Sequence, residues 1–277
     1  MKNVVTHLSV DLDAVTACWL IKKFLPGWKN AKIVFVHAGS TIDNLPPDTN
    51  PNIIHVDTGY GRFDHHQHDQ YTCAAKLVFD FLVKKKYVND KLVLPLERLV
   101  DFVNDIDHFA ESGFPEATSD RYDFLFSHIV EGLKSTLRDD QKIIDISFDI
   151  LDAVLQTMKN KVKAEEEIKK ALVFKSRWGK TIAMETDNEE ALKLALKMGY
   201  SLAIRKSPSK GFVRIKTLPQ KNLDLTSLYL KLQTADKKAS WFLHASKNML
   251  LNGSSKNPDL IPSSLSLRKL IEIVKEM

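Results

Sequence analysis

Residue types that bind metals alternate near the start of the sequence. His7, Ser9, Asp11 and Asp13 lie at the end of a strand predicted over residues 3–10. Because alternate residues of an extended chain share a face, we expect these four side chains to point together toward the carboxyl edge of a sheet. Neighbouring carboxylates repel each other unless a cation lies between them, and an imidazole beside them suits a transition metal. The alternative is a turn whose aspartates cap the following helix.

Two further groups of the same residue types follow along the chain. Asp57 closes the apolar run 53–56, where an acidic residue is either part of a site or a turn former. The segment Asp64-His65-His66 comes next, and four of the nine histidines fall between residues 55 and 68. Adjacent histidines point in different directions, so one can bind a metal while the other faces a substrate. An aspartate beside a ligand histidine can also fix its tautomer.

A fourth candidate comes from the geometry of the helix predicted over residues 91–106. Its apolar face runs through positions 96, 99, 100 and 103, and Asp107 continues that face four residues after Val103. A carboxylate on a core face is costly unless it is paired or bound to a metal. Asp107 is therefore the candidate ligand, whereas Asp105 is expected on the exposed polar face. The alternative is that the helix ends before residue 107.

Alternating strands and helices must position these side chains. The order β-α-β-β-α predicts an α/β fold with a mostly parallel sheet and flanking helices. Active sites in such sheets lie at the carboxyl ends of the strands. The predicted strands are 3–10, 32–37 and 51–58, and the predicted helices are 13–25, 72–85 and 91–106.

The rest of the chain predicts a helical linker and a second domain. An apolar stripe at steps of four and three predicts one long helix over residues 141–170, with a polar far end. We therefore expect a metal-binding catalytic domain at 1–140, the linker at 141–170 and a smaller α+β substrate-binding domain at 171–277. Within the last region we predict hairpins over 171–186 and 201–216, and helices over 188–200, 223–233 and 266–277.

Charge separates the two halves of the chain. Residues 1–170 carry 21 basic and 26 acidic side chains, residues 171–277 carry 19 and 9, and the whole chain has a net charge of +5. The acidic part suits cation binding, and the basic part suits an anionic partner, unless its lysines only aid solubility. No apolar run reaches the roughly 18 residues of a membrane span. The start lacks a signal-peptide cleavage region, and Cys18 and Cys73 are expected to be buried free thiols, which together favour a cytoplasmic protein without a membrane partner.

Taken in order, these motifs resemble those of the DHH phosphoesterase superfamily. That superfamily includes RecJ-type exonucleases, oligoribonucleases, cyclic-dinucleotide phosphodiesterases and family II pyrophosphatases. The motifs that carry the resemblance are His7-x-x-x-Asp11-x-Asp13, Asp57, Asp64-His65-His66 and Asp107. The sequence is also similar to the Myg-type (melanocyte proliferating gene) branch through Phe63-Asp64-His65-His66-Gln67 and Phe242-Leu243-His244-Ala245-Ser246. Leu12 departs from the polar residue that many DHH proteins have between the first two aspartates, which puts one supporting contact in doubt.

The resemblance implies a role for each motif residue. It implies two ions, Mn²⁺ or Mg²⁺, bridged by Asp57 and activating a water for attack on phosphorus. The remaining ligands would be His7 and Asp11 for one ion, and Asp13, His65 and Asp107 for the other. His66 would face the substrate phosphate, either stabilising its charge or protonating the leaving group.

The back half is expected to grip the substrate. Arg205 lies in a basic hairpin that could contact phosphates or could protect a solvated strand edge. His244 is either a core histidine or, as the Myg-type likeness implies, a substrate contact. The segment Asn252-Gly253-Ser254, continuing to Ser255 and Lys256, could cradle an anion through its N–H groups or could be an ordinary turn.

The function predicted from these features is hydrolysis of a phosphodiester in a short RNA, a short DNA or a nucleotide, in the manner of an exonuclease. A pyrophosphatase-like hydrolase is the enzymatic alternative, and a non-catalytic metal- or nucleotide-binding module is the other. The presence of His66 favours an enzyme, because a module that only binds needs no proton donor. A zinc hydrolase with a single ion would leave the surplus aspartates unexplained. The oligomeric state stays open.

Overall fold

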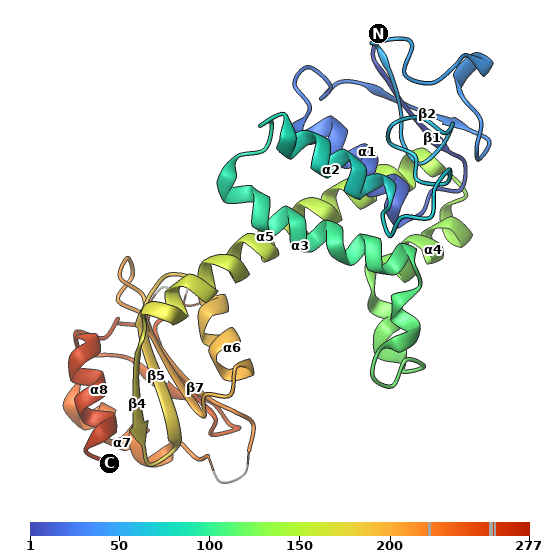
Figure 1. The fold of residues 1–277 in the computed structure, drawn as a ribbon. Helices are drawn as coiled ribbons and strands as arrows, with labels where there is room; N and C mark the ends of the chain where they lie inside the picture. Colours follow the sequence, from blue (N-terminus) through green and yellow to red (C-terminus); the bar gives the residue numbers. More distant parts are fainter. Residues whose placement is uncertain (221–222, 255–256, 258) are drawn as a thin grey trace. The chain divides into compact units, whose positions relative to one another are not determined.

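The computed structural model describes residues 1–277 except 221–222, 255–256 and 258. The chain packs as two compact units, Met1–Lys159 and Asn160–Met277 (Figure 1). The long helix predicted over 141–170 is confirmed as α5, Asp140–Lys170, which contributes buried residues to the apolar cores of both units.

A three-stranded parallel sheet organises the first unit. Its central strand β1, Asn3–His7, pairs with β2, Lys32–Val36, on one side and with β3, Ile53–His55, on the other. The parallel sheet predicted for this region is therefore confirmed, although all three strands are shorter than predicted. Because the strands run the same way, their carboxyl ends lie at one edge of the sheet, which is where the histidine and aspartate motifs follow them.

Helices complete the first unit, and their bounds are α1 at Leu12–Phe24, α2 at Ala74–Lys84, α3 at Asp90–Asp107 and α4 at Phe126–Leu137. Helix α1 is buried without a break from residue 12 to residue 21, so other elements surround it on all sides. Helix α3 reaches Asp107, and the alternative that it ends earlier is wrong. Helix α4 and the 3₁₀ turns at Ala110–Gly113 and Asp120–Phe124 are not among the predicted elements.

A six-stranded mixed sheet organises the second unit, in the order β4-β5-β6-β7-β9-β8. The strands are β4 at Leu172–Ser176, β5 at Gly179–Glu185, β6 at Leu202–Lys206, β7 at Val213–Thr217, β8 at Trp241–Leu243 and β9 at Met249–Asn252. The two predicted hairpins are confirmed, because β4–β5 and β6–β7 are both antiparallel pairs.

Helices cover both faces of this sheet, and their bounds are α6 at Glu189–Lys197, α7 at Thr226–Ala235 and α8 at Leu267–Lys275. Residues of α7 and α8 share one apolar core with the sheet, whereas residues of α6 and of the end of α5 share another. Figure 1 shows α6 and α8 on opposite sides of the strands. Among the described residues, no helix is long and apolar enough to cross a membrane.

Candidate metal centre

The turn after β1 brings the first motif to the edge of the sheet. The strand ends at His7, Ser9 adopts a left-handed backbone with φ of 60°, and Asp11 caps α1 by accepting from the Ala14 N–H at 3.0 Å. The prediction that residues 7, 9, 11 and 13 share one face of an extended strand is therefore wrong. The capping alternative is right for Asp11, yet its side chain still lines the same cavity as His7.

A carboxylate from a distant helix fixes this turn. Asp140, the first residue of α5, accepts from the N–H groups of Ser9 at 2.9 Å and of Val10 at 3.2 Å. Bonds to a charged acceptor are stronger than those between neutral groups, so the backbone between His7 and Asp11 is held in place.

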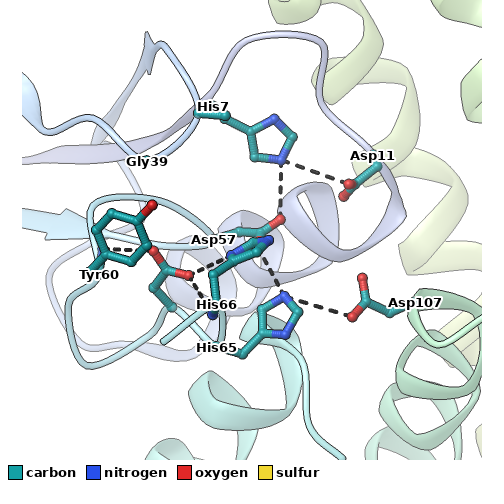
Figure 2. A pocket seen from close by; sticks show the side chains of 10 residues that line it. His7, Asp11, Gly39, Asp57, Tyr60, His65, His66 and Asp107 are labelled. Carbon is teal, nitrogen blue, oxygen red and sulfur yellow. Dashed lines mark hydrogen bonds and ion pairs between the residues drawn. The ribbon is translucent and has the colours of Figure 1, made fainter. Parts of the chain in front are cut away.

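Asp57 lies between two imidazoles at the end of β3. Its Oδ2 is 3.1 Å from the Nε2 of His7, and its Oδ1 is 3.4 Å from the Nε2 of His65 (Figure 2). The residue is 4% exposed and has a left-handed backbone with φ of 55°, a conformation that aspartate tolerates better than most residues. Its Oδ1 is buried and makes no hydrogen bond of good geometry with any described residue, although His65 lies 3.4 Å away, and such an oxygen is costly unless a cation faces it.

Most of the ligand atoms gather into two groups. Within each group, the ligand atoms lie within 4.8 Å of one another. The first group is His7, Asp11 and Asp57, and the second is Asp13, His65 and Asp107. Because the two oxygens of Asp57 face one histidine from each group, this carboxylate has the position of a bridging ligand. Figure 2 shows the side chains of five of these residues converging on one cavity, namely His7, Asp11, Asp57, His65 and Asp107.

The charges of this cluster are unbalanced without a cation. Burial and the neighbouring carboxylates raise the pKa values of Asp11, Asp13 and Asp107. Burial opposes the charge of His7, but its hydrogen bond with Asp57 and the nearby carboxylates raise its pKa to about 9. The carboxylate of Asp57, 3.4 Å away, likewise raises the pKa of His65 to about 9. Burial opposes the charge of Asp57, and the two imidazoles lower its pKa.

These residues fit divalent cations. Oxygen and imidazole ligands suit Mn²⁺ or Mg²⁺, and the unpartnered Oδ1 of Asp57 supplies a further ligand atom. Burial keeps the thiols of Cys18 and Cys73 protonated by raising their pKa values, which removes the soft ligands that would favour zinc.

Asp13 has a second task that the sequence does not reveal. Its two oxygens accept from the N–H groups of Ala74 and Ala75, each at 2.7 Å, and its side chain is 1% exposed. Asp13 thus caps α2 from the first turn of α1 while its Oδ2 lies 3.9 Å from the Nε2 of His65. The same carboxylate joins two helices and borders the metal cluster.

His66 lies beside the ligand groups, with its ring 4.3 Å from that of His65, and it is more exposed than the other histidines of the cavity. Its Nδ1 is 2.7 Å from Asp64 Oδ1, and 56% of its side chain is exposed. Asp64 is 1% exposed and also accepts from the N–H groups of His66 at 3.1 Å and of Tyr60 at 2.7 Å. The aspartate thus fixes the orientation of His66 rather than that of the ligand His65. Although His66 also lies near Asp57 and His65 in a third ligand group, its Nδ1 is already taken by Asp64.

The cavity around these residues has a volume of about 310 Å³ and contains side chains that the sequence did not single out. Tyr60 lines it with 59% of its surface exposed, next to Gly39, where an added Cβ would meet the tyrosine oxygen at 3.0 Å. A second cavity of about 290 Å³ shares Asp11 and Asp107 and is lined also by Glu111 and His128. Glu111 and His128 lie in the 3₁₀ turn at Ala110–Gly113 and in α4, two elements that the sequence did not predict. The burial predicted for the two aspartates is wrong. Asp105, expected to be exposed, is half-buried, and Asp107, expected on the core face, is an exposed residue with 18% of its side chain accessible.

For two residues of the second unit, Arg205 and His244, the structure excludes the alternative to substrate binding. Arg205 lies on β6, an interior strand, so the interpretation as a solvated strand edge is wrong. His244 is exposed, and its Nδ1 is 2.8 Å from Ser246 Oγ, so the core-histidine interpretation is also wrong.

The predicted anion cradle has a different structure from that expected. Asn252 is fully buried: its amide donates to two carbonyls, at 3.0 and 3.1 Å, and accepts from Ser263 N–H at 2.6 Å. Its side chain therefore belongs to the core and not to a substrate site. Gly253 has a φ of 77°, and an added Cβ would meet the Phe212 ring at 2.1 Å, so close packing explains this glycine. Ser254 lines a cavity with Arg205.

The remainder of that segment, Ser255 and Lys256, lies outside the described residues.

Comparison with solved structures finds proteins with DHH-type descriptions. One is described as the DHH domain of a member of a family of ribosomal proteins, with 10% identity, a TM-score of 0.32, and coverage of 99% of this chain and 86% of that chain. Another is RecJ in complex with Mg²⁺ from Thermus thermophilus, with 11% identity, a TM-score of 0.28, and coverage of 99% and 54%. The chain thus spans about half the length of that RecJ.

A third structure is a Methanococcus jannaschii protein assigned to the family II inorganic pyrophosphatases, with 13% identity, a TM-score of 0.22, and coverage of 99% of both chains. These similarities are too low to establish a shared fold, so the function must be argued from the geometry of the site. No curated protein matches the chain.

Comparison with protein families gives a match over the first unit. The matching model is described as ChrB, C-terminal domain, and covers residues 4–158, which include every residue of the metal cluster. It is not a DHH model, and the likeness to the Myg-type branch stays a prediction. Because the match covers more than half of the sequence, the chain belongs to the family described as ChrB, C-terminal domain.

Proposed function

We propose that the chain is a metal-dependent phosphohydrolase whose ligand groups hold two divalent cations, Mn²⁺ or Mg²⁺. The observation that carries the proposal is the position of Asp57, whose two oxygens face His7 at 3.1 Å and His65 at 3.4 Å. A buried carboxylate shared in this way is suited to bridge two ions. When bound, such a pair of ions would neutralise phosphoryl charge and lower the pKa of a bound water, so that hydroxide would be available for attack on phosphorus.

The protein's own side chains have separate tasks in this proposal. Two sets of side chains would hold the cations, with Asp57 between them. One set is His7 and Asp11, and the other is His65, Asp13 and Asp107. The cavity of about 310 Å³ admits a phosphate ester beside these ligands. Its open side leaves room for a leaving group larger than the phosphoryl group itself.

His66 is placed to handle the proton. With Nδ1 donating to Asp64 at 2.7 Å, its Nε2 is left to face the substrate. Nε2 can then donate a proton to a phosphoryl oxygen or to the leaving oxygen, while Asp64 holds the ring in place. A module that only binds metal would have no use for this oriented imidazole, which favours an enzyme over the non-catalytic alternative.

We further propose that the substrate is a phosphodiester of a short RNA, a short DNA or a nucleotide, cleaved in the manner of an exonuclease. The net charge of +10 over residues 171–277, from 19 basic and 9 acidic side chains, supports a polyanionic substrate. Tyr60, exposed beside the metal cluster, offers a ring on which a base can stack. A pyrophosphatase-like activity is the second candidate, because the cavity also suits a small phosphoanhydride.

The test is a turnover assay of the full chain with Mn²⁺, Mg²⁺ or EDTA. The substrates are pyrophosphate, a cyclic dinucleotide, short RNA, short DNA and an aryl phosphodiester. Asp57→Asn is the decisive variant, because asparagine tolerates the left-handed backbone at this position. Asp80→Asn is the matched control, since Asp80 is a half-exposed carboxylate of α2 that pairs with Lys76.

We expect metal-dependent cleavage of a nucleic-acid substrate that Asp57→Asn abolishes and Asp80→Asn leaves intact. Bound metal, measured by elemental analysis, should fall in Asp57→Asn as well. Full activity of Asp57→Asn, or equal turnover in EDTA, would overturn the proposal. Turnover of pyrophosphate alone would replace the exonuclease with the second candidate.

A further inference from the structure

One face of the six-stranded sheet in the second unit is only partly covered. Helix α6 and the end of α5 pack on Ile182, Met184 and Ala203, which lie on β5 and β6. The same face continues onto β7 and β9, where Arg214 pairs with Arg205 on one side and with Leu251 on the other. A cavity of about 410 Å³ lies over these strands beside α6, in the size range of ligand pockets.

The walls of this cavity carry a concentration of positive charge. Four cations, Arg205, Arg214, Lys193 and Lys216, line it, and Glu189 is the single acidic side chain among the described residues of its wall. Helix α6 contributes one lysine, β6 one arginine, and β7 an arginine and a lysine that point to the same face because they are two residues apart.

Arg205 is buried to a degree that calls for an anionic partner. Its side chain is 4% exposed, its Nη1 donates to the Thr186 carbonyl at 3.0 Å, and its buried Nε has no hydrogen-bond partner among the described residues. A buried guanidinium is costly unless its charge is compensated and its N–H groups are satisfied. Arg214, the neighbour of Arg205 on β7, has 23% of its side chain exposed and can therefore reach a ligand that enters the cavity from solvent.

Glu189 provides that compensation only in part. Its Oε1 lies 3.4 Å from Arg205 Nη2 and 3.2 Å from Arg214 Nε, so one oxygen is shared by two guanidinium groups. The side chain of Glu189 is 60% exposed, and exposed ion pairs contribute little stability. A phosphate group, with more charge and more acceptor oxygens, can replace this carboxylate at the two arginines.

The remainder of the cavity wall is apolar. Leu192 of α6 and the side chains of Met249 and Leu251 on β9 line it, and the two β9 residues are half-buried. A flexible methionine and branched aliphatic side chains form a surface against which a flat aromatic ring can pack. The ligand that matches both parts has a phosphate at one end and a planar apolar group at the other.

We propose that this cavity is a nucleotide-binding site. The phosphate binds between Arg205 and Arg214 and displaces Glu189, while the base lies against Leu192, Met249 and Leu251. Every residue of the site belongs to the second unit, and binding there requires no metal ion. The inference therefore stands apart from the hydrolysis proposed for the metal centre.

Calorimetric titration of the full chain with AMP tests the site, with EDTA present throughout so that the metal centre has no part in the result. Inorganic phosphate and adenosine are titrated separately. Arg214→Gln removes one guanidinium, Glu189→Gln removes the competing carboxylate, and Met249→Ser removes part of the apolar wall. Arg268→Gln, at an arginine of α8 that is 91% exposed, is the matched control.

We expect AMP to bind at least tenfold more tightly than phosphate or adenosine. Arg214→Gln should weaken AMP binding at least tenfold, Glu189→Gln should strengthen it, and Arg268→Gln should leave it unchanged. Met249→Ser should weaken the binding of AMP but not that of phosphate. Lys216→Gln, at a half-buried residue of the same wall, provides a second loss of charge if Arg214→Gln does not fold.

Several results would overturn the inference. AMP that does not bind, or that binds equally well to Arg214→Gln and Lys216→Gln, would show that the cationic wall does not hold the phosphate. AMP that binds no better than inorganic phosphate would show a site for phosphate alone and exclude the nucleotide.

Discussion

Asparagine substitutions at Asp13 and at Asp107 separate the structural and the ligand roles of two residues proposed to bind the same cation. In Asp13→Asn the side-chain amide can accept only one of the two N–H groups, those of Ala74 and Ala75, that the carboxylate accepts at 2.7 Å. The other N–H is left buried and faces a second donor. A buried donor without a partner costs roughly 1–3 kcal/mol, whatever the protonation state of the original carboxyl group.

Asp107 differs because its contacts are weaker. Its Oδ2 lies 3.7 Å from His65 and 3.9 Å from the Nδ1 of His108, beyond hydrogen-bond length. Burial and the neighbouring carboxylates raise its pKa, so its charge is unfavourable in the folded protein without a metal. Above the unfolded-state pKa this charge opposes folding, and Asp107→Asn removes it.

The assay is urea unfolding at pH 7, first in EDTA and then with excess Mn²⁺. In EDTA both substitutions remove a carboxyl group whose pKa is raised by burial, but only Asp13→Asn leaves a buried N–H unpaired, so its unfolding free energy should lie roughly 1–3 kcal/mol below that of Asp107→Asn. With Mn²⁺ at 100 times its dissociation constant, each bound ion should stabilise the unsubstituted chain by about 2.7 kcal/mol. Both variants should lose the share due to the second ion. Equal stability losses of the two variants in EDTA would refute this reasoning.

Three other predictions concern Asp64, the two ligand histidines and Gly253. Asp64→Asn should lower turnover by roughly 10²–10⁴-fold through loss of His66 orientation, and metal content should be unchanged; a fall in bound metal would contradict this. The affinity for Mn²⁺ should rise between pH 6.5 and 9, because His7 and His65, with pKa values of about 9, must lose protons to bind metal. Calorimetric titration with Mn²⁺ at several pH values checks this. An affinity that does not change with pH would count against both histidines as ligands. Gly253→Ala should lower thermal stability by several degrees, because a Cβ would meet an aromatic ring at 2.1 Å and the φ is 77°; an unchanged melting temperature would argue against that contact.

The residues of the candidate metal centre could be predicted from the sequence because they follow short elements in a recognisable order. Helical spacing selected Asp107 as a ligand candidate, and the structure has Asp107 at 3.7 Å from His65. The burial on which that selection rested is wrong, because Asp107 is exposed and Asp105 is half-buried. Extended-strand spacing misled at the first motif, because the strand ends at His7 and the left-handed Ser9 redirects the chain. Nothing in the local pattern indicates where a strand stops when an aspartate cap and a buried helix follow at once.

Long-range contacts account for what could not be predicted. The pairing of Asp13 with the start of α2 joins residues 61 and 62 positions apart, and no local periodicity predicts such a contact. The segment that begins at Asn252 has the composition of an anion-binding turn. Asn252 is nevertheless buried at the end of β9, where its side-chain amide makes hydrogen bonds with backbone groups. The cationic wall of the second unit depends on strand register, since Arg205 and Arg214 become neighbours only when β6 and β7 pair.

The carboxylate of Asp140, which clamps the turn after β1 through hydrogen bonds, bears on the order in which the protein folds. Its bonds to Ser9 and Val10 close loops of 131 and 130 residues, so they form only after the long intervening chain has been ordered. During synthesis, His7, Asp11 and Asp57 emerge early, but the turn between the first two stays unclamped until the start of α5 has left the ribosome. Hydrogen exchange at Ser9 and Val10 should therefore become slow late in refolding, after protection of the strand amides of β1.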